Sequence, residues 1–322
     1  MPDLKKLIAG QKDIVDPLLL LMQEAKFPKT IKEWVEALRD QEYLATDSLV
    51  EDALDTIEEM GYDIKTVTAG KNKRCGLVRH GHFDSEAYYK LLGNVQLPAL
   101  ITTDWHVGSK SFTKIGFNKM LEDVDKYKVK DVVMTGDLLQ GLGVYATEAM
   151  DVLEPSIDAQ ERHLIKLLNQ FPSRTNFHAI IGNHEEKIKG QWMVGHDAIK
   201  SVANQVDNFN YYGHIAKLQL EKKWNMLLIH GSGSAGSYAI SYNAQKLYER
   251  LPEQPDILLM GHVHRLMVLP MPLNKYIMIS GTLQRENSWL MQKGIIAQIG
   301  WIVLHDFGKS HADFTIHTPE VF

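Results

Sequence analysis

The sequence has one cysteine, Cys75, in 322 residues. Without a second thiol no disulfide can form within the chain, which favours a reducing compartment. Long hydrophobic runs are also missing: PLLLLM at residues 17–22, the longest near the start, is too short to span a bilayer. It follows acidic residues and lacks the cleavage pattern of a signal peptide. We therefore expect a cytoplasmic protein without a membrane-bound segment.

An excess of positive charge is missing as well. The chain has 35 Lys and Arg against 40 Asp and Glu, a net charge of −5. This balance gives no general attraction to nucleic acid or to an anionic membrane. A phosphate-bearing substrate must therefore be held by local positive charge, and bound metal is one source. The composition, 44% hydrophobic and 23% charged, is typical of a soluble globular protein long enough for more than one domain.

Residues 1–93 differ from residues 94–322 in their sequence pattern, and we predict a domain in each. In the first, residues 30–40 and 46–62 have helical periodicity, and residues 63–80 are typical of a β-hairpin. Helices followed by a hairpin resemble a winged helix-turn-helix domain.

The charges of this first domain argue against sequence reading by its second helix. Residues 1–93 have 13 Lys and Arg against 17 Asp and Glu, a net of −4. The helix at 46–62 presents carboxylates that would repel phosphates: Asp47, Glu51, Asp52, Asp55, Glu58 and Glu59. The basic residues lie in and near the hairpin turn: Lys71, Lys73, Arg74 and Arg79. The domain is therefore expected either to contact a nucleic-acid backbone through the wing or to serve as a protein-docking or dimerisation module.

From Pro98 onward, short apolar strands alternate with helical segments, which indicates an α/β fold. Five apolar runs, PALITT, DVVMTG, HAIIG, NMLLI and DILLMG, each end at polar residues. In chain order these residues are Asp104 and His106, then Asp137, then Asn183 and His184, then His230, and finally His262 and His264. Sites in open α/β sheets form at the carboxyl ends of strands.

The residue types are those of a metal site. Carboxylate, imidazole and amide oxygen suit divalent metals such as Mn, Fe, Zn, Co or Ni. Neither a thiolate cluster nor an all-oxygen cage is present, which disfavours structural zinc and calcium. Seven donors are too many for one ion, so two metals sharing a bridging carboxylate is the economical interpretation: Asp104, His106, Asp137, Asn183, His230, His262 and His264.

The motifs DWH, GD, GNHE, H and GHVH resemble, in order and spacing, those of calcineurin-like metallophosphoesterases over about residues 98–310. The resemblance implies a four-layer α/β/β/α sandwich with a dinuclear site, in which Mn²⁺ is the most expected metal. It assigns Asp104, His106 and His264 to one metal. It assigns Asn183, His230 and His262 to the other, with Asp137 between them. His184 matches a catalytic histidine that acts on the substrate.

Three further stretches, DWHVGSKSF, GDLLQGLGVY and SGTLQ, resemble the phosphoesterase domain in the small subunit of archaeal family-D DNA polymerases, a 3′→5′ exonuclease. This implies a metal-dependent phosphodiesterase of nucleic acid, with DNA favoured. A nucleotide phosphodiesterase or phosphoprotein phosphatase stays open, because the same metal core serves all of these. A DNA-binding regulator with an inactive phosphoesterase domain is disfavoured by the complete set of donors.

Other residues near these motifs have two interpretations each. Lys110 and Arg265 either contact phosphate or are solvated, and His196 either lines the substrate cleft or does not. His178, inside a predicted strand, is expected in the core. GSGSAG at residues 231–236 matches a dinucleotide-binding pattern, but the following strand ends in a histidine rather than the required acid, so we exclude that function.

Overall fold

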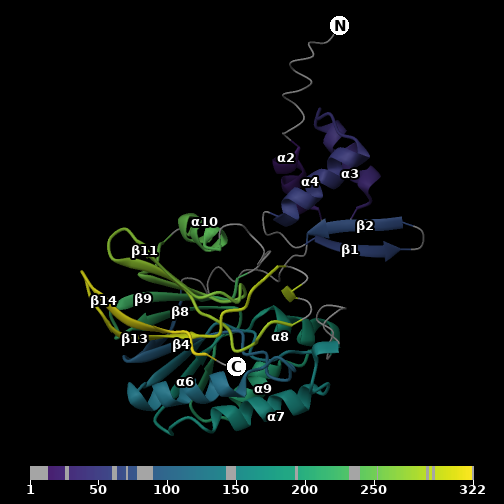
Figure 1. The fold of residues 1–322 in the computed structure, drawn as a ribbon. Helices are drawn as coiled ribbons and strands as arrows, with labels where there is room; N and C mark the ends of the chain where they lie inside the picture. The colour runs from purple at the N-terminus through teal and green to yellow at the C-terminus, as the bar shows by residue number, and fades with distance from the viewer. Residues whose placement is uncertain are drawn as a thin grey trace. The chain divides into compact units, whose positions relative to one another are not determined.

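The structure is a computed structural model and describes residues 14–25, 29–59, 64–69, 72–77, 90–142, 150–192, 195–231, 240–251, 253–287, 290–291 and 294–320. They form two compact units, one within residues 14–77 and one within residues 90–320 (Figure 1). Strand β3 (Leu91–Val95) crosses the expected boundary between residues 93 and 94. It pairs with β8 (Ile215–Leu220) of the second unit, so this unit begins before residue 94.

The first unit packs three helices against an antiparallel hairpin. The elements are α2 (Val15–Glu24), α3 (Ile31–Asp40), α4 (Asp47–Glu59), β1 (Ile64–Ala69) and β2 (Asn72–Leu77). Two of the helices and the hairpin are those that the sequence predicts. Thr30 precedes helix α3 as its N-cap and forms a capping box with Glu33, in which each side chain accepts a hydrogen bond from the other's backbone N–H. Its buried Trp34 donates a hydrogen bond of 3.0 Å from Nε1 to the carbonyl of Cys75, which joins the helix to the hairpin.

The second unit contains two six-stranded sheets. The first has the order β14 (Ala312–His317), β13 (Trp301–Phe307), β4 (Ala99–Thr102), β5 (Asp131–Met134), β6 (Asn176–Ala179) and β7 (Phe209–Tyr211). The second has the order β11 (Met267–Met271), β12 (Lys275–Ile279), β10 (Ile257–Met260), β9 (Trp224–Ile229), β8 and β3.

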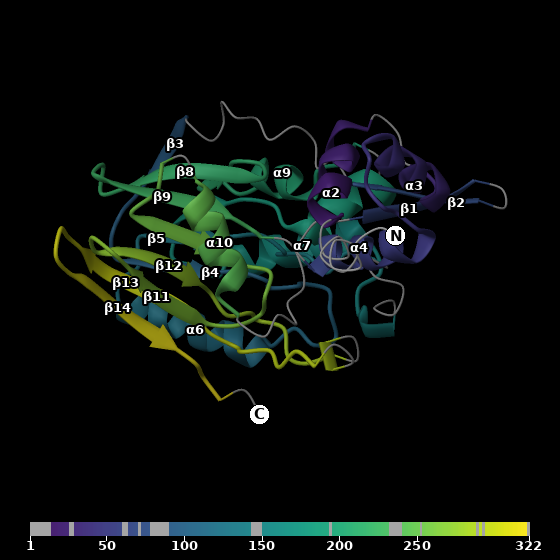
Figure 2. The ribbon, with the colours of Figure 1, turned by 90° about the horizontal axis from the view of Figure 1, so that it is seen from above.

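Helices cover the outer face of each sheet. Helices α6 (Lys114–Lys126), α7 (Ile157–Leu168) and α9 (Ala198–Ala203) pack on the first sheet, and α10 (Tyr242–Arg250) packs on the second (Figures 1 and 2). The core between the sheets is apolar and includes Ile101, Val133, Leu228, Leu259 and Met278. This is the four-layer α/β/β/α sandwich that the resemblance implies. None of the helices in the described part of the chain combines the length and apolar character needed to cross a bilayer.

The sheet topology gathers the predicted site residues. Strands β4, β5 and β6 are adjacent and parallel in the first sheet, as are β9 and β10 in the second. All five end where a polar motif begins, so their carboxyl ends bring residues 104–106, 137, 183–184, 230 and 262–264 to one region. There, α8 (Asn183–Lys187) and a π-helical turn, η3 (Ile188–Trp192), follow β6 directly.

Candidate metal centre

The backbone is unusual at the predicted ligands. Five of them have positive φ angles although they are not glycine: Asp104 (51°), His106 (50°), Asp137 (51°), His262 (73°) and His264 (52°). Side chains on L-residues disfavour this left-handed conformation, and such strain concentrates at functional sites. The turns after the strands are therefore shaped to direct donor atoms rather than to minimise local strain.

Two glycines let these turns pack closely. A Cβ atom on Gly182 would lie 2.1 Å from Oδ1 of Asp137, and one on Gly261 would lie 2.2 Å from Oγ1 of Thr103. Neither distance leaves room for a side chain. The glycines of the GN and GH motifs are thus required by the approach of neighbouring strand ends.

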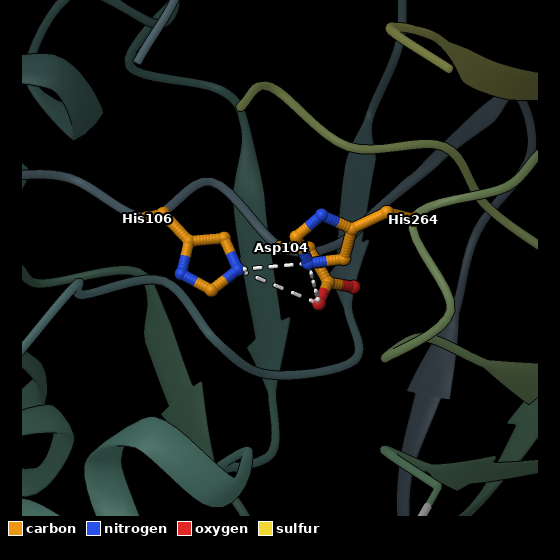
Figure 3. A group of neighbouring side chains, drawn as sticks. All are labelled: Asp104, His106 and His264. Carbon is orange, nitrogen blue, oxygen red and sulfur yellow. Dashed lines mark hydrogen bonds and ion pairs between the residues drawn. The ribbon is translucent and has the colours of Figure 1, made fainter. Parts of the chain in front are cut away.

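The first group of donors is Asp104, His106 and His264 (Figure 3). The Nε2 atoms of the two histidines lie 3.0 Å apart. Oδ1 of Asp104 lies 3.7 Å from Nε2 of His106 and 3.2 Å from Nε2 of His264. The other oxygen, Oδ2, accepts hydrogen bonds from the His262 backbone and the Thr103 hydroxyl. Oδ1 is buried and has no hydrogen-bond partner. Two imidazole nitrogens and a buried carboxylate oxygen thus converge on one point.

Electrostatics keeps this group ready for a cation. Burial, together with the neighbouring His184, lowers the pKa of His106 to about 4. Burial alone would raise the pKa of Asp104, but the adjacent histidines hold it well below its usual value. A neutral imidazole beside a charged carboxylate is the protonation state that a divalent metal requires.

The second group is Asp137, His230 and His262, with Asn183 beside it. Oδ2 of Asp137 lies 3.0 Å from Nε2 of His230. Oδ1 of Asn183 lies 3.1 Å from Nε2 of His230 and 2.8 Å from Nδ1 of His262. His230 donates from Nδ1 to the Thr135 carbonyl at 2.6 Å, which turns Nε2 toward the group.

The charge of Asp137 dominates this second group. Burial would lower the pKa of His230, but the Asp137 carboxylate raises it to about 10. The same histidine, with His184, lowers the pKa of Asp137 against the effect of burial. In the absence of metal, a proton on His230 therefore balances the carboxylate.

Asp137 also belongs to the surroundings of the first group. Its ligand atom lies within 4.8 Å of those of His106 and His184. Its Oδ1 accepts a hydrogen bond of 2.8 Å from the backbone N–H of His184. A carboxylate in this position can serve metals on both sides.

His184 is oriented by the backbone. Nδ1 lies 2.7 Å from the carbonyl of Gln140 and donates to it, so Nε2 is the nitrogen that can exchange a proton with a substrate. The ring packs edge-on against His106, with 4.5 Å between the centroids.

Glu185 was not singled out as a site residue by the sequence analysis, although it closes the GNHE motif. This buried side chain accepts hydrogen bonds from the backbone N–H groups of Asp137, Leu139 and Gly182. Burial, together with the charge of Asp137, raises its pKa to about 7. Glu185 ties the turn after β5 to the turn after β6, and its position three residues after Gly182, the N-cap of α8 whose N–H it accepts, is the local signal for it.

The remaining candidates have separate surroundings. Lys110 donates to the carbonyl of Met150, and His196 pairs with Glu161. His178 is buried in β6 between Tyr212 and Asp131, as a core residue should be. Arg265 is half-buried. Lys71, Arg79 and residues 232–236 lie outside the described residues.

A sequence profile described as calcineurin-like phosphoesterase matches residues 97–266, more than half of the chain. The chain belongs to the calcineurin-like phosphoesterase family. Within this phosphoesterase, a segment of 98 residues (27% of the chain) is 31% identical to the DNA polymerase II small subunit of Pyrococcus horikoshii. A segment of 94 residues (26%) is 33% identical to that of Methanocaldococcus jannaschii. Each match covers 16% of the relative, so the chain spans only a small part of these proteins' length.

Solved structures with a similar fold include YfcE, a phosphoesterase from E. coli, at 17% identity and a TM-score of 0.38. This match covers 65% of the present 322-residue chain and 88% of YfcE. Another is a single mutant of Vps29 from Entamoeba histolytica, at 16% identity and a TM-score of 0.37, covering 68% and 98% of the two chains.

The donor set fits divalent metal. Imidazole and carboxylate are present in both groups, and the second adds the amide oxygen of Asn183. A carboxylate oxygen without a hydrogen-bond partner is buried in the first. Such an oxygen is costly to bury unless a cation compensates it.

Proposed function

We propose that this phosphoesterase is a metal-dependent phosphodiesterase that hydrolyses nucleic acid, with DNA the favoured substrate. The observation that carries the proposal is the convergence of the donors after β4, β5, β6, β9 and β10, which includes the buried Oδ1 of Asp104, an oxygen without a hydrogen-bond partner. The preference for DNA is supported by the curated relatives, which are DNA polymerase II small subunits.

In this proposal Asp104, His106 and His264 hold one divalent metal. Asn183, His230 and His262 hold the second, and Asp137 serves both. Mn²⁺ is favoured, and Fe, Zn, Co or Ni would also suit these donors. Bound metal would supply positive charge to the phosphoryl oxygens and lower the pKa of the attacking water.

His184 is proposed as the general acid. Its Nδ1 donates to the Gln140 carbonyl, so a second proton on Nε2 is the one it can give to the departing oxygen. The hydrogen bond from the His184 backbone N–H to Oδ1 of Asp137 fixes the place of His184 beside the proposed metal donors. The ring therefore acts on the substrate, while Glu185 holds the two turns that carry Asp137 and His184.

A nucleotide phosphodiesterase or a phosphoprotein phosphatase remains an alternative of the same chemistry. A DNA-binding regulator with an inactive phosphoesterase domain is the alternative of another class. The full set of donors disfavours it, because a protein without metal has no reason to retain two groups of buried charges. The first unit, proposed as a winged-helix-like domain, would contact DNA or a protein partner, which includes a second copy of the chain.

The test is a substrate panel. Single- and double-stranded DNA and RNA, labelled at either end, would be incubated with Mn²⁺, Mg²⁺ or EDTA, beside bis-p-nitrophenyl phosphate, a cyclic nucleotide and a phosphopeptide. We expect cleavage of DNA with Mn²⁺ and none with EDTA, and a ladder from 5′-labelled strands for digestion from the 3′ end. Hydrolysis of the phosphopeptide alone would favour the phosphatase. If none of these substrates is hydrolysed with any metal, the DNA-binding regulator with an inactive domain would be favoured.

A further inference from the structure

Gln140, whose carbonyl orients His184, is one of three buried glutamines that lie close together. Gln140 is 1% exposed, Gln160 is 0% exposed and Gln284 is 2% exposed. A buried amide is costly unless it is hydrogen-bonded. None of the three is among the proposed metal ligands, so their burial needs another explanation.

Gln284 holds the side chain of Gln140. Its Nε2 donates to Oε1 of Gln140 at 2.9 Å and to Oγ of Ser109 at 3.0 Å. Its own backbone N–H donates to Oγ1 of Thr282 at 2.9 Å, and the Thr282 hydroxyl donates to the Asp104 carbonyl at 2.6 Å. The segment 282–284 is thus tied both to a predicted ligand and to Gln140.

Gln160 hydrogen-bonds both backbone groups of Gly141, the residue after Gln140. Its Oε1 accepts from the N–H of Gly141 at 2.8 Å, and its Nε2 donates to the Gly141 carbonyl at 3.0 Å. The backbone N–H of Gln140 donates to the carbonyl of Val107 at 2.9 Å. The turn at residues 140–141 is therefore held at its backbone, at its side chain and at the following peptide. The one remaining backbone group, the Gln140 carbonyl, accepts Nδ1–H of His184.

We propose that Gln284 and Gln160 are positioning residues for His184. By fixing the Gln140 carbonyl they keep a proton on Nδ1 of His184 and aim Nε2 at the departing oxygen of the substrate. This inference rests on the proposed role of His184 as general acid. It gives the SGTLQ and GDLLQ stretches a function that metal binding does not require.

The kinetic test compares two leaving groups. Gln284→Met keeps the length of the side chain and removes its donor. We expect turnover of a DNA substrate to fall about 10- to 100-fold, the usual range for a residue that orients a site residue, with little change in KM. Turnover of bis-p-nitrophenyl phosphate should fall less, because its leaving group needs little protonation. In a His184→Ala background, Gln284→Met should add no further loss. Gln170→Met, at an exposed position, is the matched control.

A second measurement does not depend on activity. The ¹⁵N chemical shifts of the His184 ring in the metal-free protein report which nitrogen has the proton. We expect the Nδ1–H form in the wild type and in Gln170→Met, and a mixture of both forms in Gln284→Met. Should Gln284→Met fail to fold, Gln160→Met makes the same test from the other side of the turn.

An unchanged His184 tautomer, with an equal loss for both leaving groups, would overturn the positioning role. Absence of wild-type activity on every substrate would overturn the proposed function instead, and the ring shifts would then still decide whether the glutamines set the tautomer.

Discussion

The two units of the chain bury different kinds of side chain. Among the described side chains within residues 14–77, every buried one is apolar, and Trp34, Leu38 and Ile57 form its centre. In residues 90–320 the buried set includes carboxylates, histidines and glutamines, most of them near the strand ends. The first unit thus uses its interior for stability, whereas the second uses part of its interior to hold a polar site. Substitutions in the two interiors should therefore have different consequences.

The largest effect is expected at Asp137, where the polar interior is most concentrated. Asp137→Asn removes the charge that both groups of donors share, so we expect turnover to fall by more than about a thousand-fold. Bound metal, measured by elemental analysis, should fall with it. Asp313→Asn, the same change at an exposed position, should leave both unchanged. Near-normal activity in Asp137→Asn would contradict the shared-carboxylate assignment.

His184→Ala separates chemistry from metal binding within the same interior. We expect turnover to fall by roughly 10²–10⁴-fold, the usual range for a lost general acid, while the metal content is retained. A substrate with a good leaving group should be affected less. Loss of metal in this variant would show that His184 is a ligand.

A smaller effect is expected at Asp131, a buried carboxylate away from the candidate metal centre. Burial would raise its pKa, but the neighbouring His178 and hydrogen bonds from Asn176 and the Gln96 backbone lower it below the usual value of 3.8. The unfolded chain therefore binds this proton more tightly than the folded one. The ionised Asp131 side chain therefore stabilises the folded state above pH 3.8, and this contribution is lost as the pH falls through the lowered folded-state pKa.

Asp131→Asn should accordingly lower the denaturant midpoint of the metal-free protein at about pH 6, and the gap to the wild type should narrow toward about pH 3. Asp313→Asn is again the control. A gap that stays constant with pH would mean that Asp131 acts through packing alone.

The smallest effect is expected in the first unit, at the hairpin turn. Arg74 lies 3.5 Å from Glu33, so the cleaner change is Lys71→Glu with Lys73→Glu, which leaves that pair intact. If the wing contacts the DNA backbone, this double variant should bind DNA more weakly. The slope of log K against log[salt] should also become flatter by about 2, one for each lost phosphate contact. Lys128→Glu with Lys130→Glu, before β5 in the other unit, matches the charge change and spacing. Equal affinity and slope in both pairs would favour a protein partner.

Much of the fold and the donor set could be predicted because both leave local signals. An apolar run followed by an acid or a histidine marks a strand end within a few residues. Helix α2 was not predicted, because Leu18, Leu19 and Leu20 leave no clear polar face in so short a run. Strand β3 was taken for a connection because it contains Gly93 and Asn94, and only its pairing with β8 makes it a strand.

The glutamines around His184 left no such signal. Gln284 meets Gln140 across 144 positions of sequence, and Gln160 meets Gly141 across 19. A glutamine in isolation is typical of a solvated surface. Which carbonyl or amide it faces depends on the packing of distant segments, and periodicity contains no information about that.

The dispersed origin of the donors has a consequence for synthesis of the chain. Asp104 and His106 precede His262 and His264 by about 160 residues, which a ribosome needs about 8–32 s to add at 5–20 residues per second. During that interval the donors after β5, β6 and β9 are added in turn, and the donors after β10 come last. An early chain can therefore offer a cation only part of each group. With the proposed ligands, stable metal loading would have to wait until the second sheet has been synthesised and has docked, so the metal would be retained only by chains whose two sheets have assembled.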